Sequence, residues 1–434
     1  MLTMKNSEIY IYIRFSQYRY YQKMNKISFP SIQSIVLALC CISLSTTLVA
    51  STICRNSLYL AFYLSVIDLF IKRPKITFNQ FTLIFFAILA LSLTLFLPTI
   101  FLESVSYHSV DQNYITTSKR IFFGAIIFIY LSSVKDKLSN KAWLIASLLI
   151  IVGFIYNSIV ALKLHHENPD QRLEIVTLAT AVAYVYALHS FCTIYIVSKF
   201  NYSKNYIVIA LVVSLSYYII LLTQTRSVIL SYPIILFLFL LKNKLIDLKF
   251  VSIIVLLCFS AIVLNLSIVK TSIERVAFTA QEVKGYENET KDTSLGSRFS
   301  LWKAGVSSFK HNPWGQSADQ RNIFSEGYII KYENANREAL RCIGSHYHND
   351  FVEMLSLRGI IGMVVSVIIL LMLVVSSYKI TKSINIHILL FLPAITYGLT
   401  DTLLIDHRCV TIFILLLPFY LLRPKSIRMS DFFK

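Results

Sequence analysis

The sequence predicts an all-α polytopic membrane protein, with about twelve transmembrane helices and one large outer loop that carries short helices. Of its 434 residues, 56% are hydrophobic and only 15% are charged, a balance that is not found in a soluble domain of this length. The apolar residues form runs that approach the roughly 20 residues needed to span a bilayer. Lysine and arginine gather between alternate runs, as the positive-inside bias requires.

Twelve apolar runs are interpreted as spans. The second carries Asp68 near its cytoplasmic end, and the fourth, eighth and twelfth runs are short. The centres of the twelve runs lie near residues 40, 63, 91, 127, 152, 185, 213, 233, 259, 368, 394 and 415.

The distribution of basic residues orients these spans. With the N-terminus inside, the inner connections carry groups such as Lys72/Arg73 and Lys242/Lys244, whereas the short outer loops hold fewer cations. An even number of spans then places both termini in the cytoplasm. Topology therefore accounts for the net charge of +18, and no basic, aromatic-interleaved patch supports nucleic-acid binding.

This topology divides the chain into five parts. The first of them is basic and rich in tyrosine, without the cleavage pattern of a signal peptide. The predicted parts are a cytoplasmic tail over 1–30, about nine spans over 31–269, an outer loop over 270–357, about three spans over 358–422 and a cytoplasmic tail over 423–434.

The outer loop is the one long polar segment of the chain, and it holds two of the three tryptophans, Trp302 and Trp314. A loop of this length in a compact protein is usually functional or disordered. Ser300–Phe309 has the spacing of an amphipathic helix, which Pro313–Gly315 then interrupts. We therefore expect short helices that lie over the bundle. There is no convincing internal repeat of the kind that builds many transporters.

The segment Gly344–Asp350, which closes this loop, holds the strongest candidate for chemistry. Neutral His348, with an ordinary pKa of about 6.5, can accept a proton near neutral pH. Asn349 can orient a sugar hydroxyl or a neighbouring side chain, and His346 is a second, weaker candidate base. The alternative is a histidine that is hydrogen-bonded at a helix start, with Asn349 or Asp350 as the cap.

Two arginines on the outer side are candidates for binding phosphate. Arg226 lies in a tight outer turn between the seventh and eighth spans, where a charge is costly and is often functional. Arg298 precedes the expected loop helix. A planar guanidinium suits bidentate recognition of phosphate. The alternatives are a snorkelling arginine at the membrane interface for Arg226 and a solvated surface charge for Arg298.

Two further charged groups lie on the outer side. Lys119 and Arg120 form a basic pair at the expected start of the fourth span, and they either bind a pyrophosphate or stabilise the interface. Asp401 and Asp406–Arg408 form a charged group between the last two spans, for which a structural role is favoured.

A metal site is not predicted. The seven cysteines show no CxxC or paired spacing, so they support neither a zinc site nor a disulfide framework. His346 and His348 need further ligands, and the nearest carboxylates in sequence, Asp350 and Glu353, fit no recognisable zinc pattern. We therefore expect no metal and no other cofactor.

The order of these features resembles the O-antigen ligase and polymerase superfamily of bacterial envelope glycosyltransferases. The resemblance covers roughly residues 205–375. One departure follows the Pro-x-Gly element, where many members have a second glycine and this chain has Gln316–Ala318. The segments that carry the resemblance are Thr225–Ser227, Ser297–Arg298, Trp302, Pro313–Gly315, His348–Asn349, Leu355 and Gly359–Gly362.

This resemblance implies a metal-independent, inverting, GT-C-like glycosyltransferase of the bacterial inner membrane, with its active site facing the periplasm. The donor would be a glycan linked to a polyprenyl diphosphate such as undecaprenyl diphosphate. The acceptor in lipopolysaccharide biosynthesis by the ligase is a sugar hydroxyl of the lipid A core. By this resemblance Arg226 and Arg298 stabilise the diphosphate leaving group, and His348 is the base toward the acceptor hydroxyl. The alternative is that these roles are swapped or shared, with His348 in contact with the phosphate.

Two alternatives to the ligase function remain. An O-antigen polymerase uses the same donor but often has two substantial arginine-bearing loops, whereas the outer turn at Arg226 is very short. A transporter or flippase fits the span count, but it predicts charges at mid-membrane depth and pseudo-symmetric broken helices. The polar residues of this chain gather instead on the outer rim, which favours the ligase.

Overall fold

The computed structural model of the protein describes residues 31–74, 76–200, 205–245, 266–287 and 291–424. The regular elements within these ranges are helical, which confirms the all-α class. The α-helices are α2 Ile32–Ser45, α3 Ser51–Lys72, α4 Gln80–Phe101, α5 His108–Ser133, α6 Asn140–Glu167, α7 Ala179–Lys199, α8 Asn205–Thr223, α9 Arg226–Lys242, α11 Leu266–Glu287, α12 Ser294–His311, α13 Ala318–Tyr332, α14 Arg337–Cys342, α15 Asp350–Thr381, α16 Leu392–Gly398 and α17 His407–Leu422.

Seven of the described helices are long and apolar enough to cross a membrane, namely α3 to α8 and α15. Three shorter apolar segments, Ile32–Ser45, His387–Gly398 and His407–Leu422, accompany them. The number of twelve spans therefore stays a prediction, and the ninth run, near residue 259, lies outside the described residues, as do residues 1–30 and 425–434. The fourth run was expected to be short, but α5 has 26 residues, because its polar first half is also helical.

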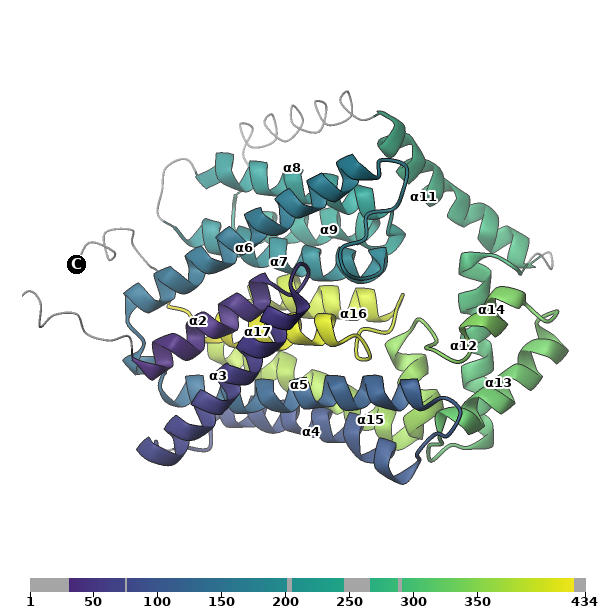
Figure 1. Cartoon of the computed structure of the whole chain (residues 1–434), viewed down its shortest axis with the longest axis horizontal. Coiled ribbons are helices and arrows are strands. Elements are labelled where there is room, and N and C mark those ends of the chain that lie inside the picture. The colour runs from purple at the N-terminus through teal and green to yellow at the C-terminus, as the bar shows by residue number, and fades with distance from the viewer. Residues whose placement is uncertain (1–30, 75, 201–204, 246–265, 288–290, 425–434) are drawn as a thin grey trace, which may run out of the picture.

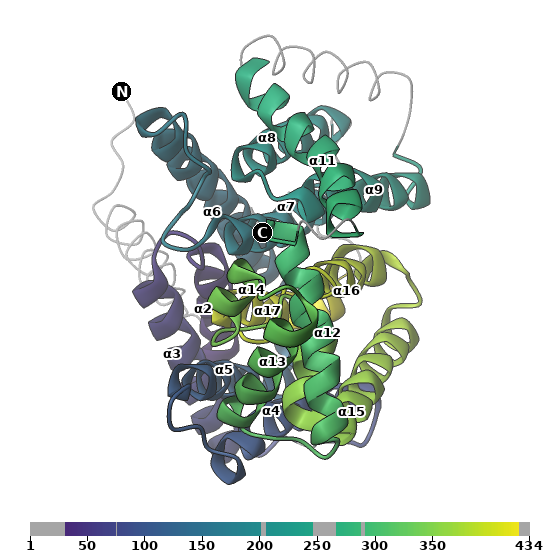
Figure 2. The ribbon, with the colours of Figure 1, turned by 90° about the vertical axis from the view of Figure 1, so that its right-hand side faces the viewer.

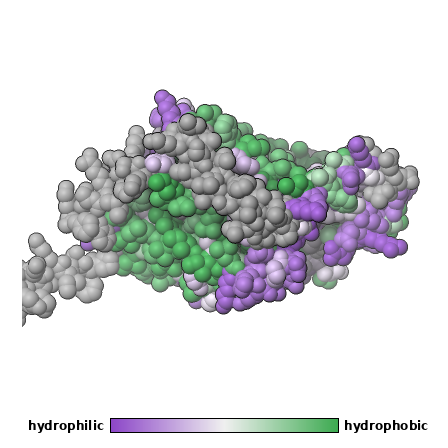
Figure 3. All heavy atoms as spheres, turned by 90° about the horizontal axis from the view of Figure 1, so that it is seen from above, coloured by the Kyte–Doolittle hydropathy of each residue, from purple (hydrophilic) through white to green (hydrophobic). Residues whose placement is uncertain are grey.

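The helices form a bundle, which α12, α13 and α14, called here the loop helices, cover at one end (Figure 1). On one side α4, α5 and α15 pack together, and on the other α6, α7 and α8 do, with α2 and α17 between the two groups. Figure 2 looks onto the covered end, where α12 and α13 cross in front of α15 and α5. Hydrophilic residues gather toward this end, whereas apolar residues cover much of the bundle surface (Figure 3).

One carboxylate oxygen of the acidic residue within α3 has two polar partners. Asp68 is buried, accepts a hydrogen bond from the Tyr130 hydroxyl at 2.7 Å and pairs with Lys72 at 2.9 Å. A carboxylate in apolar surroundings needs such partners, because its desolvation is costly. These contacts explain how an apolar helix retains this charge.

The loop helices begin where local capping permits. The helix expected over Ser300–Phe309 is α12, which starts earlier because Thr293 accepts a hydrogen bond from the backbone N–H of Gly296 at 3.0 Å. Helix α15 begins at Asp350, capped by the Asn349 side chain, and therefore earlier than the predicted boundary between 357 and 358.

A set of backbone hydrogen bonds, called here the interlock, joins the loop segment Pro313–Gln316 to α15. It explains the Pro-x-Gly element of the loop and the glycine at position 359. Helix α15 is broken at Gly359, where φ is 64° and ψ is −165°. The N–H of Ile360, whose usual helical acceptor would be the carbonyl of Ser356, donates instead to the Pro313 carbonyl at 2.9 Å. The Gln316 backbone N–H donates to the carbonyl of Leu357 at 3.0 Å.

The buried side chain of Gln316 completes this interlock. Its Nε2 donates to the carbonyl of Ser356 and to the hydroxyl of Ser308, each at 2.7 Å. Three backbone groups at the break, the N–H of Ile360 and the carbonyls of Ser356 and Leu357, therefore have hydrogen-bonding partners in the loop, as buried polar groups require. This chain has Gln316–Ala318 where many members of the family have a second glycine. The Gln316 amide thus supplies hydrogen bonds at the break.

Replacement of Gly359 by alanine should destabilise this interlock. The φ and ψ of Gly359 lie in a region that is essentially restricted to glycine. A Cβ there would also lie 2.4 Å from the Pro313 carbonyl oxygen. We expect the free energy of unfolding to fall by at least about 1–3 kcal/mol, measured by thermal and denaturant unfolding of the purified protein in lipid nanodiscs.

The matched control for this prediction is Gly327→Ala in α13. A Cβ at Gly327 meets no atom within 4 Å, and alanine favours a helix interior over glycine by up to about 1 kcal/mol. The control should leave stability unchanged or raise it. Equal effects of the two substitutions would contradict the interlock.

Candidate active site

The candidate catalytic histidines share one carboxylate. His348 Nδ1 lies 2.9 Å from Asp401 Oδ1, and His346 Nε2 lies 3.3 Å from the same oxygen. The two rings are 4.3 Å apart between centroids, in an edge-to-face arrangement. His348 has a positive φ of 50°, a conformation that non-glycine residues seldom adopt and that is often found at functional sites.

Asp401 is the functional candidate that sequence reasoning missed. It was grouped with Asp406–Arg408 as a structural cap, and it lies 53 residues after His348 in the chain. The turn between α16 and α17 brings Asp401 into contact with both histidines. The one signal in the sequence was an acidic residue among the outer loops, which does not identify a partner.

The shared carboxylate separates the pKa values of the two histidines. Burial opposes ionisation of Asp401, but the hydrogen bonds from His346 and His348 outweigh it and hold the pKa of Asp401 well below its usual range. Burial would lower the pKa of His346, yet Asp401 raises this pKa above its ordinary value. The pKa of His348 is lowered, first by burial and then by the charges of His346 and Arg298, despite Asp401. Near neutral pH His348 is therefore the more often neutral of the two, and only a neutral imidazole is free to accept a proton.

Asn349 and Arg298 fix the position of the turn that carries Asp401. The Asn349 side chain caps α15 and donates to the carbonyl of Leu399 at 3.0 Å. Arg298 Nη1 donates to the carbonyl of Thr400 at 2.6 Å. The capping role that was considered for Asn349 is thus observed, and the structure brings Arg298, Asn349, His346 and His348 together.

Tyr347, between the two histidines, is held by a buried ion pair. Arg321 and Glu353 are fully buried and lie 2.8 Å apart, and Glu353 also accepts a hydrogen bond from the Tyr347 backbone N–H at 2.9 Å. Trp302 Nε1 donates to the Tyr347 carbonyl at 2.9 Å. The two histidines therefore project from a backbone that is fixed from both sides.

Arg226 lies in a neighbouring set of contacts. It begins α9, forms an ion pair with buried Glu282 of α11 and donates to the hydroxyl of Thr279 at 3.2 Å. These contacts hold it at the start of α9, against α11. Among the described residues, no hydrogen bond links it directly to His348.

The structure does not place Lys119 and Arg120 with the histidines. Both lie in the interior of α5, which begins earlier, at His108. Lys119 is exposed and its ammonium lies 5.2 Å from the centre of the Tyr59 ring. Arg120 is buried and donates to the Thr411 hydroxyl at 2.8 Å. Because the two side chains diverge, they offer no common face to one pyrophosphate.

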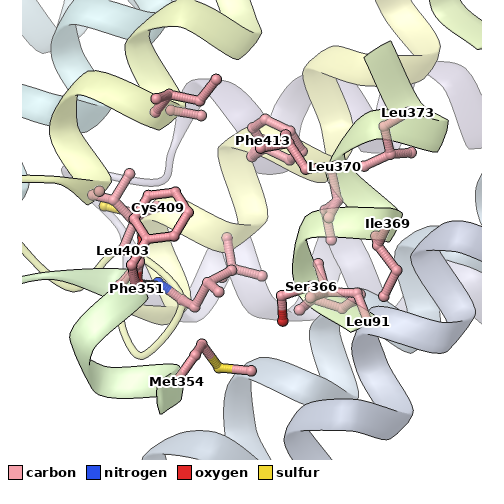
Figure 4. Close-up of a pocket in the computed structure, with 18 of the residues that line it drawn as sticks. Leu91, Phe351, Met354, Ser366, Ile369, Leu370, Leu373, Leu403, Cys409 and Phe413 are labelled. Carbon is pink, nitrogen blue, oxygen red and sulfur yellow. Dashed lines mark hydrogen bonds between the residues drawn. The ribbon is translucent and has the colours of Figure 1, made fainter. Parts of the chain in front are cut away.

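One cavity adjoins the histidine pair, and a second cavity lies next to the first. A polar cavity of about 330 Å³ is lined by His346, His348 and Asp401 together with residues of α5, α7 and α17. An apolar cavity of about 150 Å³ lies between α15, α16 and α17, and its wall includes the Phe351, Met354 and Phe413 side chains seen in Figure 4. The two cavities share the wall residues Tyr184, Leu403 and Cys409.

The donor atoms at this site also allow a metal ion. One ligand atom each from His346, His348 and Asp401 lies within 4.8 Å of the others. The carboxylates that the sequence offered are engaged elsewhere, since Glu353 pairs with Arg321 and Asp350 accepts a hydrogen bond from the Leu404 backbone N–H at 3.1 Å. Asp401 is therefore the third member of the cluster. Activity in the presence of a chelator tests whether the site needs a metal ion.

Comparison with known proteins shows which proteins the chain resembles. Residues 209–367 match the family model described as O-Antigen ligase. The O-antigen ligase of Escherichia coli (strain K12) is 29% identical over 309 residues, which are 69% of this chain and 70% of that protein. This likeness implies a glycosyltransferase-like enzyme, which the sequence predicted. The resemblance to the O-antigen ligase and polymerase superfamily is thereby confirmed, and the matched segment contains Arg226, Arg298 and His348.

Proposed function

We propose that this protein is an O-antigen ligase, which transfers a glycan from a polyprenyl diphosphate to a sugar hydroxyl of the lipid A core at the periplasmic face of the inner membrane. The observation that carries the proposal is the pairing of His348 with Asp401 beside Arg298. His348 and Arg298 lie inside the segment that matches the O-antigen ligase family. The reaction is inverting and needs no metal.

The base in this proposal is His348. Its Nδ1 faces Asp401, which leaves Nε2 to accept the proton of the acceptor hydroxyl as that oxygen attacks the anomeric carbon. Asp401 orients the imidazole and stabilises the imidazolium that forms. The lowered pKa of His348 supports this role, because the ring is neutral at neutral pH and ready to accept a proton.

Arg226 and Arg298 are proposed to stabilise the diphosphate leaving group. Negative charge grows on the diphosphate as the anomeric C–O bond breaks, and preorganised guanidinium groups stabilise it most in a water-poor site. Arg298 lies beside the turn of Asp401, and Arg226 lies at the outer end of α9. The carboxylate of Glu282 pairs with Arg226 until the diphosphate of the donor replaces it as the partner of the guanidinium.

The apolar cavity next to the site supports a lipid-linked substrate. Its wall is formed almost entirely by aliphatic, aromatic and methionine side chains (Figure 4). Apolar surface of this kind is favourable for a hydrocarbon chain, which leaves water on entering. It shares part of its wall with the polar cavity at His348, so the proposed site offers adjacent volumes for a polyprenyl chain and for polar sugar groups.

Reconstitution tests the proposed function directly. Purified protein is supplied with polyprenyl-diphosphate glycan and rough lipopolysaccharide in the presence of a chelator. We expect glycan to appear on the lipid A core. Longer lipid-linked glycans without capped lipopolysaccharide would assign a polymerase instead, and a reaction that depends on restored metal would overturn metal independence. Absence of any glycosidic product with and without metal would reject the transferase.

The transfer rate should fall at acidic pH with a midpoint below about 6.5, the ordinary pKa of histidine. Only neutral His348 accepts a proton, and the pKa of His348 is lowered, so activity is retained until the pH drops through this lowered value. His346→Gln should move the midpoint upward, because it removes a charge that lowers the pKa of His348. A pH profile of kcat for both proteins checks this, and an unmoved midpoint would contradict the shared carboxylate.

A further inference from the structure

Two arginines that the proposed mechanism does not use lie beside those that it does. Arg172, in the loop between α6 and α7, donates from Nε to the carbonyl of Thr223 at 3.1 Å. The next residue, Leu173, donates its N–H to the carbonyl of Leu222 at 3.0 Å. The loop is therefore fixed to the end of α8, immediately before the turn that carries Arg226.

Arg275 approaches the same region from α11. Arg226 donates to the hydroxyl of Thr279 at 3.2 Å, and that hydroxyl donates to the carbonyl of Arg275, one helical turn earlier, at 3.2 Å. Residues four apart lie on one face of a helix, so Arg275 lies on the face of α11 that meets Arg226. Among the described residues, no hydrogen bond from its guanidinium is found.

The charges of these residues act on one another. The pKa of Arg172 is lowered, first by burial and then by Arg275, with smaller effects of Arg298 and Arg226, while Glu174 opposes them. The pKa of Arg275 is lowered by burial and then by Arg226, and Glu282 opposes this. Two carboxylates thus face four guanidiniums from α9, α11, α12 and the α6–α7 loop, which leaves an excess of positive charge.

Half-buried groups of like charge repel one another and are costly to desolvate. A multivalent anion removes this cost, because guanidinium groups bind phosphate oxygens through paired, charge-assisted hydrogen bonds. A diphosphate offers enough oxygens to engage several arginines at once. Arg298 connects this four-arginine cluster to the catalytic turn, since it donates to the Thr400 carbonyl next to Asp401.

We propose that Arg172 and Arg275 bind the diphosphate of the lipid-linked donor, together with Arg226 and Arg298. The identity of the donor rests on the proposed function. The two added arginines act on binding of the donor rather than on proton transfer, because their contacts lie on the side of Arg226 and not at His348.

The test measures KM for the donor and for the acceptor separately in Arg172→Ala and Arg275→Ala. Loss of a hydrogen bond between charged groups should raise the donor KM roughly tenfold to a hundredfold and leave the acceptor KM unchanged. The matched control is Lys284→Ala, which removes one positive charge from an exposed position of α11. Thermal unfolding of each variant verifies that it is folded.

Two results would overturn this assignment. A donor KM in both arginine variants equal to that of Lys284→Ala would exclude binding by these residues. A rise in the acceptor KM alone would assign the cluster to phosphate groups of lipopolysaccharide. Binding of inorganic pyrophosphate to the wild-type protein and the same variants provides a separate readout, so a failure of glycan transfer is distinguishable from a failure of the cluster.

Discussion

Replacement of His348 by alanine should lower kcat for glycan transfer by about 10²–10⁴-fold, the usual contribution of a general base. The donor KM should change little, because His348 is assigned to the acceptor hydroxyl and the arginines to the diphosphate. The measurement is the steady-state rate of capped lipopolysaccharide formation at saturating donor. It is compared with that of His311→Ala, which removes an exposed histidine at the end of α12.

Asp401→Asn refines this result. Asparagine retains the hydrogen-bonding shape but loses the charge that stabilises the imidazolium, so kcat should fall, by less than in His348→Ala. A variant of His348 that retains wild-type kcat would exclude it as the base. In that case His346, which shares the same carboxylate oxygen, becomes the residue to replace.

Replacement of Arg321 by methionine should produce the largest loss of stability, about 3–5 kcal/mol, the usual effect of leaving a buried charge without its partner. Both members of the Arg321–Glu353 pair are fully buried. Glu353 would retain only the hydrogen bonds from the Tyr347 backbone and the Tyr114 hydroxyl. Unfolding by heat and denaturant in nanodiscs gives the loss directly.

A double-mutant cycle separates the pair from simple loss of packing. Because Glu353→Gln removes the second charge, the double variant should recover much of the stability that Arg321→Met loses. The exposed Arg341–Glu338 pair on α14 is the matched control, and Arg341→Met should have little effect. Strictly additive losses in the cycle would show that the two charges do not stabilise each other.

The helices could be predicted from the sequence because apolar runs of sufficient length form helices wherever the backbone cannot bond to water. Of the twelve predicted span centres, the one near residue 259 lies outside the described residues, and each of the others falls within a helical segment. The extent of α5 was not predictable in this way, because its first half is polar and is stabilised by neighbouring helices rather than by lipid.

The candidate site was only partly predictable. His348, Arg298 and Arg226 stand in a recognisable order along the chain, so a family resemblance could select them. Asp401 could not be selected, because its pairing with His348 depends on how the turn between α16 and α17 packs. Arg275 was missed for the same reason, since its significance arises from the position of α11 beside Arg226.

The interlock at Gly359 constrains how the protein is assembled in the membrane. A membrane helix ordinarily satisfies its backbone within its own segment as it enters the bilayer. Helix α15 does not, because the Ile360 N–H and the carbonyls of Ser356 and Leu357 find their partners in Pro313 and Gln316. Its final form therefore requires the loop segment around Pro313 and Gln316 to lie against it. Formation of α15 must therefore end with a docking step, in which a segment synthesised earlier completes a helix synthesised after it.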